Sequence, residues 1–269
     1  MMKSFVANKN RKLSKLALEN IQDLSYSAFC KALRKKDVKV NGKRVNEDIL
    51  LSVGDKVDIY YQETVIKKYT VIFSDQNVIV INKKVGFTSE DVFNALSKEF
   101  AGVRFIHRLD RNTDGVMIFA RNDQSEKELL FGFKERTFEK KYYATVKGVP
   151  KIKQAVLTAY LLKDGDASQV KIYDNHVKGS VPIKTGYKVI ETDGETSVLE
   201  VELFTGKTHQ IRAHLSYIGY PILGDGKYGD FAFNKKRGVN GQMLTAKSLT
   251  LHFSKDCALR YLDGKTFSI

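Results

Sequence analysis

A carboxylate surrounded by cations marks the stretch of this chain best suited to chemistry. Asp110 lies in RFIHRLDRNTDG, residues 104–115, together with Arg104, Arg108 and Arg111. Nearby positive charges favour the ionised form of a carboxylate, so we expect Asp110 to be charged at neutral pH. Such a group can act as a nucleophile or a base when desolvation and fixed geometry support it. On composition alone, a salt-bridged turn residue is the commoner interpretation, because most such acids are structural.

Three further stretches carry more polar groups than a core or a plain surface requires. One holds Arg136, Lys140 and Tyr142, and the others read GKTHQIRAHL at 206–215 and GYPILGDGKYG at 219–229. Together with residues 104–115, these stretches hold the side chains that a reactive site could use.

The glycine pattern G-x-G-x-x-G at 224–229 does not predict a dinucleotide site. A dinucleotide loop opens an apolar helix and precedes an acid by about 20 residues. Here residues 231–240 are basic and irregular in pattern, and no Asp or Glu occurs between Phe231 and Ser254. We assign these glycines to tight turns and expect no nucleotide cofactor.

Other common site types fit the sequence poorly. His209 and His214 are five residues apart, so they lack the i, i+4 spacing of a zinc helix. Cys30 and Cys257 form no C-x-x-C motif, and no G-x-S-x-G motif of a serine hydrolase occurs. A glycosidase needs a second carboxylate in the cleft, and Asp114 is the one acid close to the motif. We therefore predict no metal site.

Overall charge points to a polyanionic partner. The 269 residues carry a formal net charge of +14, with a sequence pI near 9.5. Such an excess favours nucleic acid before membrane. No apolar run approaches the about 18 residues of a membrane span, and the first residues lack the apolar core of a signal peptide. With two distant cysteines, the chain is expected in a reducing cytoplasm.

The reactive stretches need elements that position them, and the sequence predicts an α+β protein. Residues 14–21 and 27–34 have helical spacing, VKVNGKRV at 38–45 predicts a tight hairpin, and residues 56–60 predict a strand. The second helix and the hairpin carry a cluster of basic side chains: Lys31, Arg34, Lys35, Lys39 and Lys43.

Strands predominate in the rest of the chain. The apolar runs 71–73 and 78–81 predict strands that are buried on both faces or central to a sheet. A helix capped by Thr88 or Ser89 is expected to run to about Phe100. The other expected elements are a buried strand at 116–120, a helix at 123–135 with Leu129, Leu130 and Phe133 inward, and strands at 142–146, 185–190 and 198–203.

Five ordered blocks resemble the RluA-type pseudouridine synthases over about residues 70–255. The signature block is HRLDRNTDG at 107–115. The other blocks are residues 82–86, Arg136 with Lys140 and residues 142–148, residues 205–215, and residues 219–229. The family implies a central mixed, mainly antiparallel sheet flanked by helices and loops. It also implies a cofactor-free isomerisation of uridine to pseudouridine in RNA.

Three positions depart from the family pattern. Lys84 occupies the place of a usual proline, Asp114 replaces a usual serine, and Leu244-Thr245-Ala246 stands where Leu-His-Ala is expected. The proline affects a local turn and leaves the chemistry intact. Asp114 adds a second acid close to the motif, without a role that the sequence reveals.

The N-terminal part resembles the αL RNA-binding module of ribosomal protein S-four. Residues 29–36, 38–45 and 53–55 carry this resemblance. It implies a small α+β RNA-binding domain at 1–61, a linker at 62–69 and a catalytic domain at 70–269. A small basic domain without a ligand is the alternative.

The resemblance to the synthases assigns roles to individual residues. Asp110 is the catalytic carboxylate, Arg212 orients it through an ion pair, and Tyr142 stacks on the target base and takes part in the final deprotonation. Arg108 enters the space of a flipped nucleotide or holds a phosphate. Further RNA contacts are expected from the remaining polar residues of the blocks: His107, Arg111, Lys140, Lys207 and His209. Attack of Asp110 at C6, attack at C1′ and removal of a sugar proton all remain open.

The expected partner is RNA, foremost 23S ribosomal RNA or its precursor, bound by a monomer. Transfer RNA is the alternative substrate. A non-catalytic ribosome assembly factor and a basic structural protein of the ribosome are the alternatives outside enzymes. The presence of Asp110, Tyr142 and Arg212 together favours the enzyme.

Overall fold

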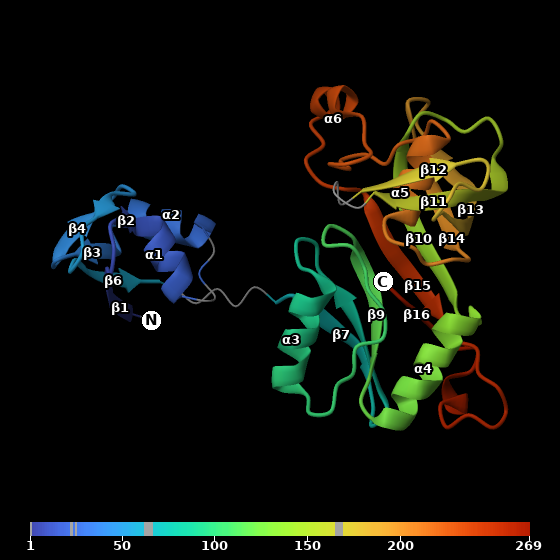
Figure 1. Cartoon of the computed structure of the whole chain (residues 1–269), viewed down its shortest axis with the longest axis horizontal. Coiled ribbons are helices and arrows are strands. Elements are labelled where there is room, and N and C mark those ends of the chain that lie inside the picture. The colour runs from blue at the N-terminus through green and yellow to red at the C-terminus, as the bar shows by residue number, and fades with distance from the viewer. Residues whose placement is uncertain (1, 22–23, 25, 62–66, 165–168) are drawn as a thin grey trace. The chain divides into compact units, whose positions relative to one another are not determined.

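The computed structural model describes residues 2–21, 24, 26–61, 67–164 and 169–269 (Figure 1). The chain divides into two compact units, Met1–Lys67 and Lys68–Ile269. Most of the expected linker, residues 62–66, lies outside the described residues. None of the helices described is long and apolar enough to cross a membrane.

The first unit combines two helices with a small antiparallel sheet of the order β1-β6-β3-β4 and a second pair, β2 and β5. Its elements are β1 (Met2–Val6), β2 (Arg11–Lys12), α1 (Leu13–Asn20), α2 (Tyr26–Arg34), β3 (Val38–Val40), β4 (Lys43–Val45), β5 (Leu50–Leu51) and β6 (Lys56–Tyr60). Asn41 and Gly42 have φ of 50° and 79°, as a tight hairpin between β3 and β4 requires. The predicted hairpin is confirmed, and the predicted helices are correct to within one residue.

One apolar cluster holds the first unit together. Phe29 and Leu33 of α2 are buried with Leu13 of α1 and with Val57 and Ile59 of β6. Burying each such side chain contributes roughly 1.5–3 kcal/mol. The apolar stripe of α2 is thus used by the core, which leaves its basic face outward.

The second unit is built on one ten-stranded sheet of the order β12-β11-β13-β14-β10-β15-β9-β8-β7, with β16 paired to β15. Its elements are β7 (Tyr69–Ser74), β8 (Val78–Lys83), α3 (Ser89–Glu99), β9 (Asp114–Ala120), α4 (Asp123–Glu135), β10 (Glu139–Lys147), β11 (Gln154–Asp164), β12 (Gln169–Tyr173), β13 (Val181–Thr192), β14 (Thr196–Leu203), α5 (Gln210–Tyr217), α6 (Phe231–Arg237), β15 (Leu244–Thr250), the 3₁₀ helix η1 (Arg260–Leu262) and β16 (Thr266–Ser268). Among the described strands, β9 and β15 pair in parallel and the other pairs are antiparallel. The expected α+β class with a mixed, mainly antiparallel sheet is confirmed.

The middle of this sheet is buried on both faces. All of Val116–Ala120 in β9 is buried, as its unbroken apolar run predicts. In β14, Leu199, Val201 and Leu203 are buried while the intervening acids are less so. This alternation confirms the predicted inward face of the strand.

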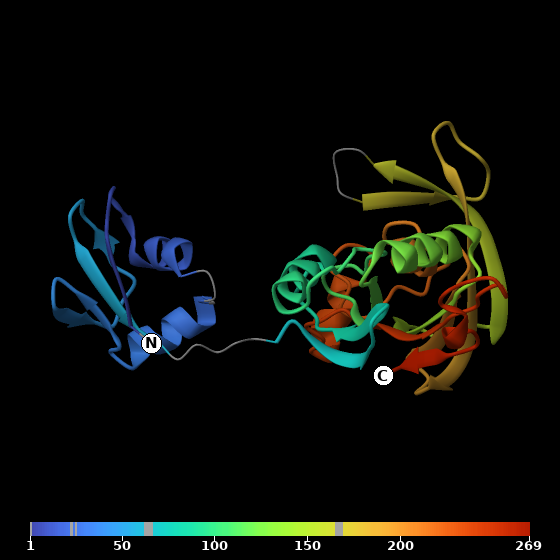
Figure 2. The ribbon, with the colours of Figure 1, turned by 90° about the horizontal axis from the view of Figure 1, so that it is seen from below.

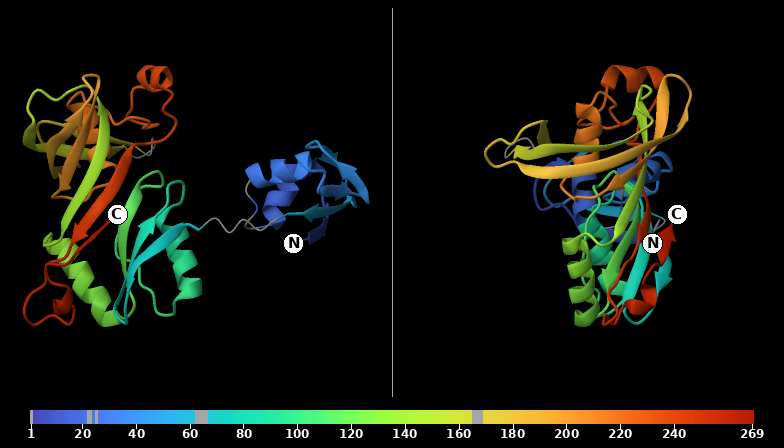
Figure 3. Two further views of the ribbon diagram at one scale, coloured as in Figure 1. Left: turned by 180° about the vertical axis from the view of Figure 1, so that it is seen from behind. Right: turned by 90° about the vertical axis from the view of Figure 1, so that its right-hand side faces the viewer.

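Helices gather on one side of the sheet. Seen nearly edge-on, α4 and α5 lie on the same side, toward which the hairpin of β11 and β12 also projects (Figure 3, right). The view from below shows the same projection of β11 and β12 beyond α4 (Figure 2). The helix α3 begins with a capping box, in which Thr88 and Asp91 exchange hydrogen bonds with each other's backbone N–H.

Two local expectations are wrong. The strand β7 is an edge strand paired with β8, and Val71 is 45% exposed, so this apolar run is neither central to the sheet nor buried on both faces. Leu130 is 43% exposed on α4, although Leu129 and Phe133 pack inward as predicted.

Residues 231–237 form the helix α6, with Asp230 accepting a hydrogen bond from the N–H of Phe233 at its start. Seven residues are too short to display a helical stripe in the sequence.

Candidate active site

The loop that carries Asp110 is fixed by backbone contacts before it enters β9. Ser89, the first residue of α3, donates its hydroxyl proton to the carbonyl of Leu109 and accepts the N–H of Leu109, both at 2.9 Å. The N–H of Thr113 donates to the carbonyl of Asp110 at 3.1 Å. The Asp110 side chain therefore leaves a backbone held on both sides.

A buried lysine ties the same loop to β8. Lys83 is fully buried, and its Nζ donates to the carbonyls of Phe87 at 2.8 Å and of Lys84 and Arg111 at 3.2 Å. Burial lowers the pKa of Lys83 to about 8, against the opposing charges of Asp114 and Asp110. Lys83 thus anchors the motif by hydrogen bonds to main-chain oxygens.

One guanidinium joins two carboxylates at the start of α5. Arg212 Nη1 donates to Asp110 Oδ2 at 2.7 Å, while its Nε and Nη2 donate to the two oxygens of Asp225 at 2.7 and 2.8 Å. All three residues are buried or half-buried. The planar fork of arginine suits this double pairing, because Nε and Nη2 fill one carboxylate and leave Nη1 for the other.

The ion pairs determine the charge of this cluster. Burial works to raise the pKa of Asp225, but hydrogen bonds from Arg212 and from the N–H groups of Lys227 and Tyr228 outweigh it, so this pKa lies below its ordinary value. Burial opposes the charge of Arg212, yet Asp225 and Asp110 raise its pKa. Asp225 and Arg212 therefore form a charged pair beside the cavity, and the same guanidinium holds Asp110.

Tyr142 stands opposite this cluster on β10. A register shift between Lys141 and Tyr142 interrupts the pairing of β10 with β15, and the ring of Tyr142 is buried. Burial and then the charge of Asp110 raise the pKa of Tyr142 above its ordinary value. The phenol therefore carries its proton at neutral pH in the free enzyme, and its expected part in the final deprotonation remains a prediction.

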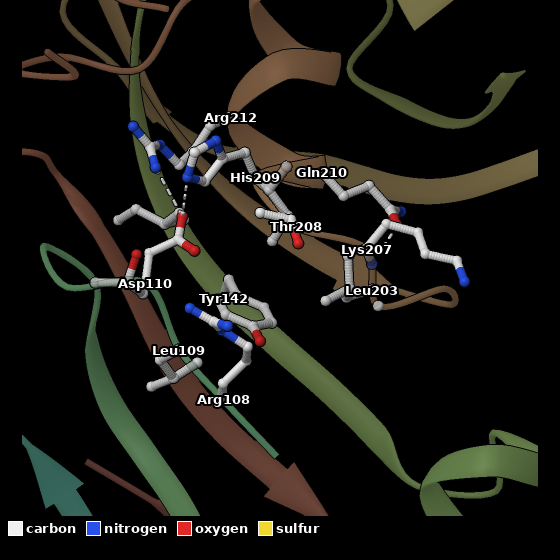
Figure 4. Close-up of a pocket in the computed structure, with 14 residues that line it drawn as sticks. Arg108, Leu109, Asp110, Tyr142, Leu203, Lys207, Thr208, His209, Gln210 and Arg212 are labelled. Carbon is white, nitrogen blue, oxygen red and sulfur yellow. Dashed lines mark hydrogen bonds and ion pairs between the residues drawn. The ribbon is translucent and has the colours of Figure 1, made fainter. Parts of the chain in front are cut away.

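A cavity of about 140 Å³ lies between these groups. Asp110, Tyr142 and Arg212 line it, as the sequence predicts (Figure 4). Arg108, Lys207 and His209 also line it. The apolar part of the wall comes from Leu109, Leu203, Ile211 and Leu244, and the rest of the lining is Thr113, Gly206, Thr208 and Gln210. A flat, apolar ring with polar edges fits such a lining.

Three predicted RNA contacts do not line this cavity. His107 stacks on Phe133 with ring centroids 4.5 Å apart, and its Nε2 accepts the N–H of Ile118 at 3.1 Å. Burial, and secondarily Lys140, lower the pKa of His107 to about 3, so the ring is neutral. Lys140 is half-buried, with its Nζ 5.9 Å from the centroid of Phe133, and Arg111 is exposed.

The basic residues expected to bind RNA in the first unit lie on its surface. Lys31, Arg34, Lys35 and Lys43 are exposed. Lys39 is half-buried, with its Nζ 5.5 Å from the centroid of Tyr60. In the second unit, Arg108 and Lys207 are exposed at the cavity, and Arg108 lies 3.8 Å from Glu90.

Asp225 and Tyr228 are site residues that the sequence did not reveal. Both lie in the glycine pattern 224–229, where a Cβ on Gly224 would come within 1.9 Å of the carbonyl of Gly241. The glycines do serve close turns, as predicted, but the turns present Asp225 to Arg212. Two features of the sequence could have indicated this contact. Asp225 is the one acid within the block 219–229, and Arg212 was expected to form an ion pair.

Asp114 also acquires a partner. Thr245 Oγ1 donates to Asp114 Oδ1 at 2.7 Å, where β9 and β15 pair in parallel. These two residues are two of the three departures from the family pattern, and they contact each other.

The described residues hold no group of three or more His, Cys, Asp or Glu side chains arranged to bind a metal ion.

Comparisons with known proteins agree with this geometry. A family profile described as RNA pseudouridylate synthase matches residues 77–217. The chain is 31% identical over 258 residues to ribosomal large subunit pseudouridine synthase C of Vibrio vulnificus, covering 85% of this chain and 81% of that protein. The protein of the same name from Escherichia coli is 29% identical over 253 residues, covering 83% of this chain and 79% of that protein.

Solved structures show the same fold. Human RNA Pseudouridylate Synthase Domain Containing 4 superposes with a TM-score of 0.58 at 27% identity, covering 67% of this chain and 83% of that chain. Human RNA Pseudouridylate Synthase Domain Containing 1 superposes with a TM-score of 0.63 at 24% identity, covering 75% and 89%. The chain belongs to the RluA-type family of RNA pseudouridine synthases, enzymes that isomerise uridine to pseudouridine within RNA.

Proposed function

We propose that this enzyme isomerises uridines in the RNA of the large ribosomal subunit, with Asp110 as the catalytic carboxylate. The observation that carries the role of Asp110 is its ion pair with Arg212 at the wall of a cavity that also presents Tyr142. The substrate class follows from relatives that are named as synthases of the large subunit. A cytoplasmic monomer is part of the same proposal.

The reaction places specific demands on Asp110. Isomerisation breaks the bond from N1 to C1′, turns the base and joins C5 to C1′; a proton leaves C5 and another is gained at N1. The atoms balance without an oxidant or a reductant. Attack at C1′, attack at C6 and removal of a sugar proton all require an ionised carboxylate at the cavity wall. Arg212 donates to Oδ2 and so holds this carboxylate in place at the cavity wall.

Tyr142 supplies a surface for the base. Its ring lies in the cavity wall beside Asp110, and aromatic side chains stack readily on bases. Burial and the charge of Asp110 raise the pKa of Tyr142, so the phenol carries its proton before the reaction begins. Tyr142 therefore holds the base in position, and its part in removing the C5 proton remains a prediction.

The target nucleotide has to leave its helix to reach this cavity. Extrusion costs a few kcal/mol, which contacts to phosphates offset. Arg108 and Lys207 are exposed where the nucleotide enters, so Arg108 can occupy the vacated space or bind a phosphate. The first unit adds exposed basic side chains on α2 and on the β3–β4 hairpin, which is the surface we assign to further RNA contacts.

Transcripts of large-subunit ribosomal RNA and of transfer RNA test the substrate. After incubation with the enzyme, carbodiimide modification and primer extension map each new pseudouridine. We expect new sites in the ribosomal transcript with wild-type protein and none with Asp110→Asn. New sites confined to transfer RNA would contradict the substrate assignment, and no site in either RNA would leave a non-catalytic assembly factor as the better account.

A further inference from the structure

His209 lies between the catalytic carboxylate and a tyrosine of the glycine-rich block. It precedes α5 with φ of 54° and ψ of 15°, a left-handed backbone that a non-glycine residue rarely adopts. Its Nδ1 is 3.0 Å from the hydroxyl of Tyr228. Its Nε2 is 3.8 Å from Asp110 Oδ2, a contact that is drawn in Figure 4. The unusual backbone thus aims the two ring nitrogens at two different partners.

The hydrogen bonds of Tyr228 determine which ring nitrogen carries the proton. The N–H of Val170, in β12, donates to the hydroxyl oxygen of Tyr228 at 2.8 Å. A phenol has one proton to donate, and among the described residues the acceptor within reach is Nδ1 of His209. With the Tyr228 proton donated to Nδ1, the proton of the neutral imidazole lies on Nε2, facing Asp110.

The imidazole is neutral for a physical reason. Burial lowers the pKa of His209, with Arg212 and Lys227 acting in the same direction and Asp110 and Asp225 opposing them. A neutral donor can hold the carboxylate without cancelling its charge. A protonated imidazole would instead form a second full ion pair and weaken Asp110 as a nucleophile or base.

We propose that His209 is a positioning residue whose Nε2–H closes onto Asp110 Oδ2 when RNA binds. Oδ2 would then be shared by His209 and Arg212, which leaves Oδ1 for the uridine. Oδ1 has no hydrogen-bond partner among the described residues, and Figure 4 shows the two dashed contacts meeting at one oxygen. The present 3.8 Å is longer than a hydrogen bond by roughly 1 Å. Catalytic contacts of free enzymes commonly tighten in the complex. This inference rests on the proposed role of Asp110.

Two substitutions separate this role from a structural one. His209→Gln keeps a donor close to the Nε2 position, although glutamine tolerates the left-handed backbone poorly. His209→Asn suits that backbone better but reaches only as far as Nδ1. If the donor matters, kcat falls about tenfold or more in His209→Asn, since a hydrogen bond to a charged group is lost, and is largely retained in His209→Gln. The KM for RNA should change little in either variant.

If His209 served only to adopt the left-handed backbone, His209→Asn would have the higher kcat of the two variants. A kcat of His209→Asn equal to or above that of His209→Gln overturns the inference. Wild-type protein and Asp110→Asn run in the same assay. Failure of the proposed function appears as an inactive wild type or an active Asp110→Asn, whereas failure of the inference leaves both of these as expected.

The proton position has a test that needs no activity. In full-length wild-type protein labelled with ¹⁵N-histidine, ¹⁵N chemical shifts distinguish the two neutral tautomers, and His209→Asn identifies the signal by its loss. We expect the Nε2–H tautomer in wild type. An Nδ1–H tautomer in wild type overturns the inference.

Discussion

Arg212 serves two carboxylates with different tasks. Asp110 faces the cavity, while Asp225 is fully enclosed and takes two of the guanidinium donors. Without Asp225, the guanidinium would lose the partner that fixes its plane, and Asp110 would lose its orientation. Asp225 thus acts on the reaction through Arg212.

Replacing Asp225 should therefore affect both stability and activity. Asp225→Asn turns an accepting oxygen into a donor that faces Arg212, so we expect the free energy of unfolding to fall by about 3–5 kcal/mol, as for other broken buried pairs. The kcat should fall as well. Asp123→Asn is the matched control, since it removes an exposed partner of Arg104 and should have little effect. Urea unfolding measures the difference, and equal effects of the two variants would contradict the role of Asp225.

Lys83 makes a prediction about pH. Its folded-state pKa is about 8, below its ordinary value, so the folded protein binds fewer protons than the unfolded chain above pH 8. Folding is penalised while Lys83 is charged, and this penalty declines as the pH rises from 8 toward 10. Relative to Lys83→Met, wild type should gain roughly 2–3 kcal/mol of unfolding free energy across that window. Parallel pH profiles of the two proteins would contradict the depressed pKa.

At the scale of elements, the parallel pair β9 and β15 brings the motif to the centre of the sheet. The backbones approach so closely that a Cβ on Gly115 would lie 2.2 Å from the carbonyl of Ala246. The hydrogen bond from Thr245 to Asp114 joins the same two strands. Asp114 and Thr245 therefore act together at the point where the catalytic loop becomes a strand.

A double-mutant cycle tests this pairing. Asp114→Ala and Thr245→Val should each lower the free energy of unfolding. Because they remove the same hydrogen bond, the double variant should be less destabilised than the sum of the two by about 0.5–3 kcal/mol. Urea denaturation of the four proteins measures the coupling. Strict additivity would mean that the contact contributes nothing.

The sequence predicted where helices and strands occur better than it predicted which side chains are buried or which residues meet. The capping residues Thr88 and Asp91 and the Asn41–Gly42 turn act through neighbours in sequence, and the predicted helix and hairpin are present there. The exposure of β7 depends on which strands pair, and an apolar run does not contain that information. Asp225 contacts Arg212 because the loop that carries it folds back against α5. Short sequence motifs do not specify such a tertiary contact.

At the scale of the whole molecule, the excess positive charge predicted a polyanionic partner, with nucleic acid favoured over membrane. The family resemblance then predicted Asp110, Tyr142 and Arg212, and these three residues line one cavity. The assignment of RNA binding to the first unit remains a prediction. The basic side chains of the first unit are exposed, but exposure alone does not show that they contact RNA.

Salt dependence tests that assignment in the full-length protein. Replacing the exposed residues Lys31, Arg34, Lys35 and Lys43 by alanine should weaken RNA binding and flatten the plot of log K against log salt by about one unit for each lost phosphate contact. The melting temperature and the kcat at saturating RNA should be unchanged, which serves as the internal control. An unchanged salt slope would show that the first unit makes no phosphate contacts.

The central claim is that Asp110 is the reacting carboxylate. Its most direct test is the single-turnover rate of pseudouridine formation, with wild type, Asp110→Asn and the neighbouring Asp114→Asn compared at saturating enzyme on one RNA. We predict no product with Asp110→Asn, although it binds the RNA and melts as wild type does, and a rate near wild type with Asp114→Asn. A rate for Asp110→Asn comparable to wild type would contradict the account.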